Sequence, residues 1–303
     1  MQLVIMEFFQ NISSPVLDTM VEWMTMLGEE TVFILAVAIF LWLASKKRGF
    51  AIFSTLFTSL IGMSILKAVV QAPRPFQVLD SIEGKRLATA TGYSFPSGHT
   101  TGAASFYSAL AYSLRRRWVS ILCALAIVLV GFSRMYLGVH WPLDVFGGLA
   151  LGITVTIVAH DWFSRLYEQP ERLSRFSIIA GSISLALGIL LALLIEFSLA
   201  DPVGFSDPVK LFSLAAGGYL GFYWEQRLIQ YTTDGTPVIK TIRFLFGIVV
   251  IVGIQSLKAV LGAHLMVSVF RYAAIGLWVT VLYPYIGTKI KVAGMPLFST
   301  EPQ

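Results

Sequence analysis

Long apolar segments, separated by short polar loops, run through most of this chain. A helix needs about 20 mostly apolar residues to cross the hydrocarbon core of a bilayer, and about 17 suffice. Because a helix satisfies its own backbone hydrogen bonds, such segments predict an all-α integral membrane protein. We expect about nine transmembrane helices, some completed by flanking polar residues, near Thr31–Ser45, Phe50–Val70, Thr100–Leu114, Trp118–Phe132, Leu143–Phe163, Phe176–Phe197, Leu211–Trp224, Phe244–Val260 and Met266–Ile286.

The composition argues against the main alternatives. Charged residues make up 13% of the chain and hydrophobic residues 56%, whereas soluble domains carry about 25% charged residues. An ordinary soluble enzyme is therefore disfavoured. A disordered chain is excluded, because disorder requires low hydrophobicity and high net charge.

The net charge of +5 would point to nucleic acid in a soluble protein, but its distribution indicates membrane orientation instead. Lysine and arginine collect in cytoplasmic loops. Alternate loops are rich in these residues, at Lys46–Arg48, Arg115–Arg117, Arg165, Arg172, Arg175, Arg227, Lys240, Arg243, Lys289 and Lys291. The sequence predicts a multi-pass cell-membrane protein, with membrane lipids and no nucleic acid as partners. The N-terminus would lie outside and the C-terminus in the cytoplasm.

The segment before the first predicted span has a different pattern. Apolar residues recur at helical spacing at Val16, Met20, Trp23, Met24 and Leu27, with acidic residues on another face. This pattern predicts an amphipathic helix lying at the outer membrane interface.

Three clusters place polar residues where lipid would penalise them, and such residues are functional candidates. The first cluster spans residues 67–75, where Lys67 lies near the outer end of the second span and two prolines flank Arg74. The second includes residues 96–99. There Ser97 is a good N-cap for the third span, Gly98 lets backbone approach a ligand, and His99 falls in the first helical turn.

The third cluster spans residues 133–144. Arg134 ends the fourth span, and His140 and Asp144 lie at the start of the fifth. Their four-residue spacing allows the carboxylate to hold one imidazole nitrogen and to leave the other as a nucleophile. All three clusters fall at the outer ends of spans two to five, so they can converge. Three cations beside a helix N-terminus suit a tetrahedral oxyanion, above all phosphate.

These motifs resemble the three signatures of the type-2 phosphatidic acid phosphatase superfamily, over residues Lys67 to Gly148. The resemblance implies a six-helix phosphatase core in residues 1–163 and a C-terminal helical extension in residues 164–303. It also implies hydrolysis of a lipid phosphate or diphosphate with no metal or other cofactor. We expect this reaction at the outer leaflet, because all three clusters fall at the outer ends of their spans.

Carried over by position, His140 resembles the nucleophile that forms a phosphohistidine, and Asp144 the residue that orients it. His99 resembles the acid that protonates the leaving group. The phosphate oxygens would be bound by Lys67, Arg74, Ser97, Gly98 and Arg134. We also expect Lys258 and Arg271 to be candidates for contact with a second phosphate or a headgroup, and Tyr93 to be a candidate substrate or headgroup contact at the entrance of the site.

Two other functions stay open at this point. A lipid phosphotransferase would use the same phosphohistidine and pass the phosphoryl group to an alcohol. A transporter also carries intramembrane charges, but these are expected near the middle of the membrane in broken helices, whereas the clusters lie at one rim. The sequence specifies neither the lipid nor the oligomeric state.

Overall fold

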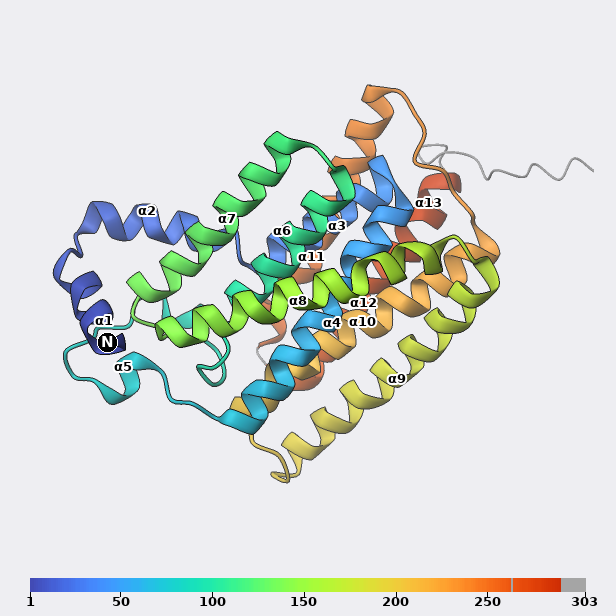
Figure 1. Ribbon diagram of the computed structural model, residues 1–303. Helices are drawn as coiled ribbons and strands as arrows, with labels where there is room; N and C mark the ends of the chain where they lie inside the picture. Colours follow the sequence, from blue (N-terminus) through green and yellow to red (C-terminus); the bar gives the residue numbers. More distant parts are fainter. Residues whose placement is uncertain (263, 290–303) are drawn as a thin grey trace, which may run out of the picture. The chain divides into compact units, whose positions relative to one another are not determined.

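The structure, a computed structural model, describes residues 1–262 and 264–289, and its described residues form helices and loops without a β-strand. Lys291, which was assigned to the cytoplasmic side, lies outside the described residues. The helices in chain order are α1 (Gln2–Asn11), α2 (Pro15–Met26), α3 (Glu30–Ile39), η1 (Phe40–Ala44), α4 (Lys46–Val70), α5 (Pro75–Val78), η2 (Leu87–Thr89), α6 (Gly98–Leu114), α7 (Arg117–Tyr136), α8 (Pro142–Tyr167), α9 (Pro170–Glu196), α10 (Pro202–Leu228), α11 (Pro237–Leu261), α12 (Leu265–Leu277), η3 (Trp278–Leu282) and α13 (Tyr283–Lys289) (Figure 1).

Six described helices are long and apolar enough to cross a membrane: α4 with its extension to Val78, α7, α8, α9, α11, and α12 with its continuation to Lys289. A seventh span is possible if α2 and the α3–η1 helix, bent by 44° at their junction, form one broken crossing. Three of the nine predicted spans are therefore not among the single helices that are long and apolar enough to cross a membrane. They correspond to α3–η1, to α6 with 17 residues and to α10. The multi-pass class is supported, and the count of nine stays a prediction.

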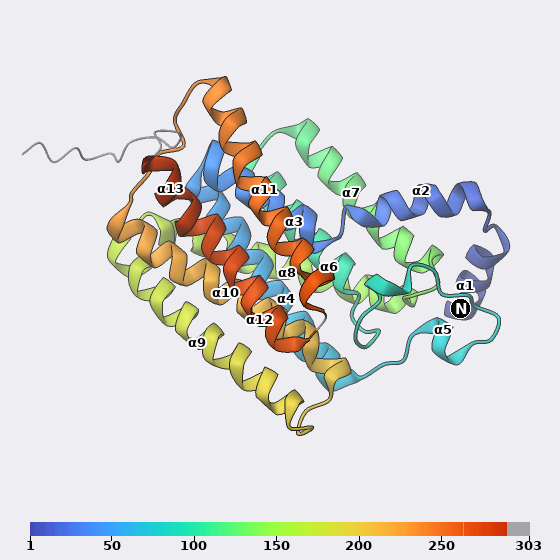
Figure 2. The same ribbon diagram turned by 180° about the vertical axis from the view of Figure 1, so that it is seen from behind.

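The chain divides into two compact units, each built from discontinuous segments. The first contains Met1–Ile34, Ala51–Phe163 and Asp201–Asp207, and the second contains Leu35–Phe50, Ser164–Ala200 and Pro208–Gln303. In the first unit α7 lies between α2 and α6 (Figure 1, Figure 2). In the second unit α12 packs against both α9 and α11.

The close approach of α8 to α6 depends on two glycines. A Cβ on Gly148 would lie 2.9 Å from the carbonyl oxygen of Ser97, and one on Gly152 would lie 2.7 Å from that of Thr101. Small residues four apart on one face let two helices in a membrane approach to backbone contact. The N-terminus of α6, with His99, is thus held against the N-terminal half of α8.

The N-terminal segment differs from the expected single interfacial helix. It forms two helices, because Ser14 caps α2 and interrupts the helical run. Val16 and Trp23 of the predicted apolar face are 71% and 73% exposed, whereas Met24 packs inward against the cluster around Val21. The opposite face of α2 turns inward through Val21 and Thr25. Interfacial placement of α2 stays a prediction.

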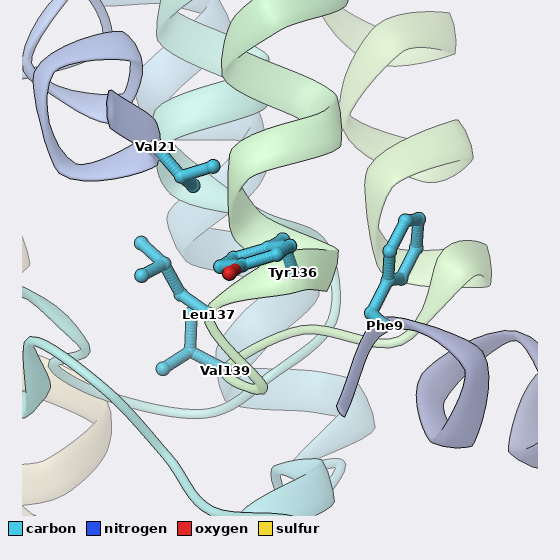
Figure 3. Close-up of a cluster of buried hydrophobic side chains, with 5 residues drawn as sticks. All are labelled: Phe9, Val21, Tyr136, Leu137 and Val139. Carbon is cyan, nitrogen blue, oxygen red and sulfur yellow. The ribbon is translucent and has the colours of Figure 1, made fainter. Parts of the chain in front are cut away.

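A small apolar cluster joins α1 and α2 to the end of α7 (Figure 3). Phe9 and Val21 pack with Tyr136, Leu137 and Val139, all of them buried. These last three residues lead directly into His140. The N-terminal helices therefore support the turn that presents the candidate nucleophile.

Candidate active site

His140 and Asp144 form a buried pair at the start of α8. The imidazole Nδ1 lies 3.3 Å from Asp144 Oδ2, and both side chains are almost fully buried. The same oxygen accepts hydrogen bonds from the Ser94 hydroxyl and from the backbone N–H of Trp141. The contact expected from the four-residue spacing is confirmed. With Nδ1–H donating to the carboxylate, Nε2 carries the lone pair of the imidazole.

Burial lowers the pKa of His140 well below 6.5, and the nearby charges of Arg74, Arg134 and Lys67 lower it further. An imidazole in this environment is neutral at pH 7. Neutral imidazole is the nucleophilic form, so the surroundings of His140 favour attack on an electrophile.

Arg74 lies on the Nε2 side of His140. Its Nη1 is 3.1 Å from Nε2 and also donates to the carbonyl of Val139. The remaining guanidinium nitrogens donate to the carbonyl oxygens of Thr91, Gly92 and Tyr93. The side chain is 2% exposed. A buried arginine beside the nucleophilic imidazole nitrogen can bind the oxygens of a phosphate attacked by that nitrogen.

Lys67 is anchored to the same loop. Its buried Nζ donates to the carbonyl oxygen of Tyr93, which also accepts from Arg74. The phenol of Tyr93 points to a different partner, with its hydroxyl donating to Asp201 at 2.9 Å. The loop of residues 91–93 therefore fixes both cations of the first sequence motif through its backbone.

Ser97 begins α6 as expected. Its hydroxyl accepts a hydrogen bond from the backbone N–H of Thr100, and its own N–H donates to the carbonyl of Asp144 at 3.0 Å. This second bond links the second and third motifs directly. Gly98 occupies the first position of α6, where a Cβ would meet only Met63 at 3.7 Å. The predicted N-cap is confirmed.

Arg134 and His99 carry polar atoms that their surroundings leave unpaired. Arg134 Nη1 donates to the hydroxyl of Thr25 at 2.9 Å and lies 3.5 Å from that of Thr89. Within the described residues, Arg134 Nε and Nη2 and His99 Nε2 are buried without a hydrogen-bond partner. A buried polar group without a partner carries a large desolvation penalty. These atoms are therefore the best placed to bind an anion.

Lys258 and Arg271 belong to the second compact unit. Arg271 is buried and donates to the carbonyl oxygens of Ile254 and Gln255 and to the Gln255 side chain. Lys258 is exposed on α11. Neither is joined to the three motifs by a described contact, so their role at a second phosphate stays a prediction.

Sequence reasoning missed several neighbours of the motifs. Ser94 lies three residues before Ser97, and this closeness to the second motif was the available signal. Thr25 and Asp201 contact Arg134 and Tyr93 across 109 and 108 residues, with no local signal. Asp207 accepts from Thr91 across 116 residues. No functional signal in the sequence pointed to Arg86, whose guanidinium pairs with Glu29 at 2.5 Å.

Comparison with known proteins assigns the chain to a class. Residues 48–168 match the family model described as the PAP2 superfamily, and residues 209–295 match its phosphatase transmembrane extension. An undecaprenyl-diphosphatase of Sulfolobus acidocaldarius is 31% identical over 163 residues, which cover 51% of this chain and 71% of that protein. A putative undecaprenyl-diphosphatase of Escherichia coli K12 is 37% identical over 143 residues, covering 45% and 70%.

Among solved structures, that of Aquifex aeolicus LpxE is 27% identical with a TM-score of 0.47, covering 52% of this chain and 93% of that one. With its multiple apolar helices, the chain is a multi-pass membrane phosphatase, a hydrolase of phosphate esters. It belongs to the PAP2 superfamily.

Proposed function

We propose that this membrane phosphatase removes the terminal phosphate of a lipid phosphate or lipid diphosphate through a phosphohistidine. The position of His140 supports this reaction. Asp144 holds its Nδ1, while Nε2 faces the buried Arg74. An oriented neutral imidazole beside a fixed cation is what nucleophilic attack on a phosphate requires.

The chemistry proceeds in two steps. Nε2 of His140 attacks phosphorus, the bond to the leaving oxygen breaks, and His99 gives that oxygen a proton. His99 then takes a proton from water, which attacks the phosphohistidine and releases inorganic phosphate. Lys67, Arg74, Arg134, Ser97 and the backbone N–H of Gly98 stabilise the charge on the equatorial oxygens. Removal of one such donor typically costs about 10²–10³ in rate.

The lipid character of the substrate has two supports. The candidate site lies in a protein whose helices are apolar enough to cross a membrane. The two relatives described above carry names that specify the diphosphate of a polyisoprenoid lipid. We place catalysis in residues 1–163, because every residue of the three motifs falls there, and assign residues 164–303 to an extension.

The site is proposed to face the outer leaflet in a protein of nine crossings, with the N-terminus outside. The support is the distribution of lysine and arginine, which are concentrated in the loops opposite to the motifs. Intact right-side-out cells should release phosphate from a membrane-impermeant substrate analogue. Activity that appears only after permeabilisation would reverse the orientation.

The mechanism is tested by trapping the intermediate. The purified protein in detergent, quenched during turnover of a substrate with a radiolabelled terminal phosphate, should carry an acid-labile, base-stable label. His140→Ala should abolish both label and turnover. His264→Ala is the matched control. This histidine is exposed, its Nε2 lies 3.8 Å from Glu196, and both residues belong to the second compact unit. Label retained in His140→Ala would refute the proposed nucleophile. Product analysis with and without an alcohol acceptor separates hydrolysis from phosphotransfer.

A further inference from the structure

Arg86 lies in the loop between α5 and α6, directly before η2. Its Nη2 pairs with Glu29 at 2.5 Å, and its Nη1 lies 3.8 Å from Glu22. Its Nε is buried and has no hydrogen-bond partner among residues 1–262 and 264–289. The side chain as a whole is 23% exposed. One edge of this guanidinium is therefore held by carboxylates while a donor on it stays unused.

Two contacts connect Arg86 to the candidate active site. The Thr89 hydroxyl donates to the Arg86 carbonyl at 3.2 Å and lies 3.5 Å from Arg134 Nη1. On the other side, the partner Glu29 follows Gly28, which packs on His99. A Cβ on Gly28 would lie 3.2 Å from the His99 Cβ. Arg86 is thus tied through Thr89 to Arg134 and through Glu29 to the neighbourhood of His99.

The unpaired buried atoms of this region have a common chemistry. Arg86 Nε and Arg134 Nε and Nη2 are cationic donors, and His99 Nε2 completes the set. By contrast, Arg74 and Lys67 on the His140 side donate to backbone carbonyls. Unused donors on Arg86 and Arg134, two residues connected through Thr89, match an additional phosphate group.

We propose that Arg86 binds the second phosphate of a lipid diphosphate, the one that departs with the lipid. This inference rests on the proposed function. The leaving phosphate lies near His99 only if His99 is the acid that protonates it. The subsite directs the enzyme toward diphosphates in preference to monophosphates with the same lipid chain.

Nε2 of His140 forms a bond to the terminal phosphorus, and the bond from that phosphorus to the bridging oxygen breaks. The bridging oxygen takes the electron pair and a proton from His99, and it leaves as part of a lipid monophosphate. Arg86 binds the non-bridging oxygens of this leaving phosphate, where it stabilises the charge that the phosphate gains, while Arg134 stays with the oxygens of the terminal phosphate.

The test compares two substrates that share one lipid chain, farnesyl diphosphate and farnesyl monophosphate, in the same detergent. Terminal phosphate release gives kcat/KM for each, and their ratio cancels any loss of folded protein. Arg86→Gln should lower the ratio of diphosphate to monophosphate by about 10- to 100-fold, the effect of one hydrogen bond to a charged group. Arg86→Lys should give a smaller decrease, because it keeps the charge but not the Nε donor.

Lys85→Gln is the matched control. Lys85 is the preceding cation of the same loop, and its amine pairs with Asp18 at 2.6 Å. It should leave the substrate ratio unchanged. A ratio unchanged in Arg86→Gln, or lowered equally in Lys85→Gln, would overturn the subsite.

Inorganic pyrophosphate and phosphate provide a second measurement as competitive inhibitors. Arg86→Gln should raise the inhibition constant of pyrophosphate about 10-fold more than that of phosphate. Equal changes for both anions would also overturn the subsite. Failure of the proposed function would give a different result. Either the wild-type protein would release phosphate from neither farnesyl substrate, or His140→Ala would stay active.

Discussion

The Ser94 hydroxyl donates a hydrogen bond to Asp144 Oδ2, the same carboxylate oxygen that faces His140 Nδ1. The hydroxyl also lies 3.5 Å from that nitrogen. With the backbone N–H of Trp141 at 2.8 Å, this oxygen is held from three directions. A carboxylate fixed in this way holds the His140 imidazole in one orientation, and the proposed nucleophilic attack by Nε2 depends on that orientation.

Ser94→Ala should therefore lower kcat about 10-fold and leave KM nearly unchanged, because it loosens Asp144 without touching a phosphate ligand. Steady-state kinetics with a soluble phosphomonoester measures the effect. Ser113→Ala is the control, since its hydroxyl contacts a different histidine, His160, at 2.9 Å. A KM effect with unchanged kcat would contradict the positioning role.

The pH dependence of kcat/KM follows from the lowered pKa of His140. Burial is the largest effect that destabilises the imidazolium form of His140, and a smaller effect comes from Arg74, Arg134, Lys67 and His99. Asp144 contacts the Nδ1 of this imidazole. Because the pKa of His140 is lowered, the neutral imidazole persists at acidic pH. The acidic limb of the kcat/KM profile should therefore lie below pH 6.5. Arg74→Gln should move this limb to higher pH as it slows the reaction. A limb above pH 6.5 in the wild type would show that the imidazole is not neutral as expected.

His99→Ala should discriminate between leaving groups. An alkoxide needs a proton to depart, whereas p-nitrophenolate leaves without one, and general acid catalysis contributes about 10²–10⁴ in rate. The loss of kcat/KM should be of that size for an alkyl phosphate and less than about 10-fold for p-nitrophenyl phosphate. Equal losses for the two substrates would reject the acid role.

The sequence predicted the contacts that depend on local spacing. The pairing of His140 with Asp144 needs only four residues of helix, and Ser97 as N-cap needs only the start of α6. Membrane class also followed from composition and segment length, which are local properties. The functions assigned to the motif residues rest on the resemblance and stay proposals.

Contacts between distant segments could not be predicted in this way. The acceptor for Arg134 on α2 is Thr25, whose neighbours in sequence carry no polar pattern. Asp201 and Asp207 reach loop 91–93 from beyond α9, although every recognised motif ends before residue 163. Such contacts depend on which helix faces pack together, and a hydrophobic period specifies a buried face without specifying its partner.

Gly152→Ala tests the close packing that positions α6. The added Cβ would lie 2.7 Å from the Thr101 carbonyl oxygen and 2.8 Å from the Ser105 nitrogen, both backbone atoms that cannot turn away. Overpacking of this kind costs about 1–3 kcal/mol, so thermal unfolding in detergent should occur several degrees lower. Gly253→Ala on α11 is the control, because its Cβ would meet nothing within 4 Å. It should stabilise or leave unchanged the unfolding temperature, since alanine favours a helix by about 1 kcal/mol. Equal unfolding temperatures for the two variants would contradict backbone contact between α6 and α8.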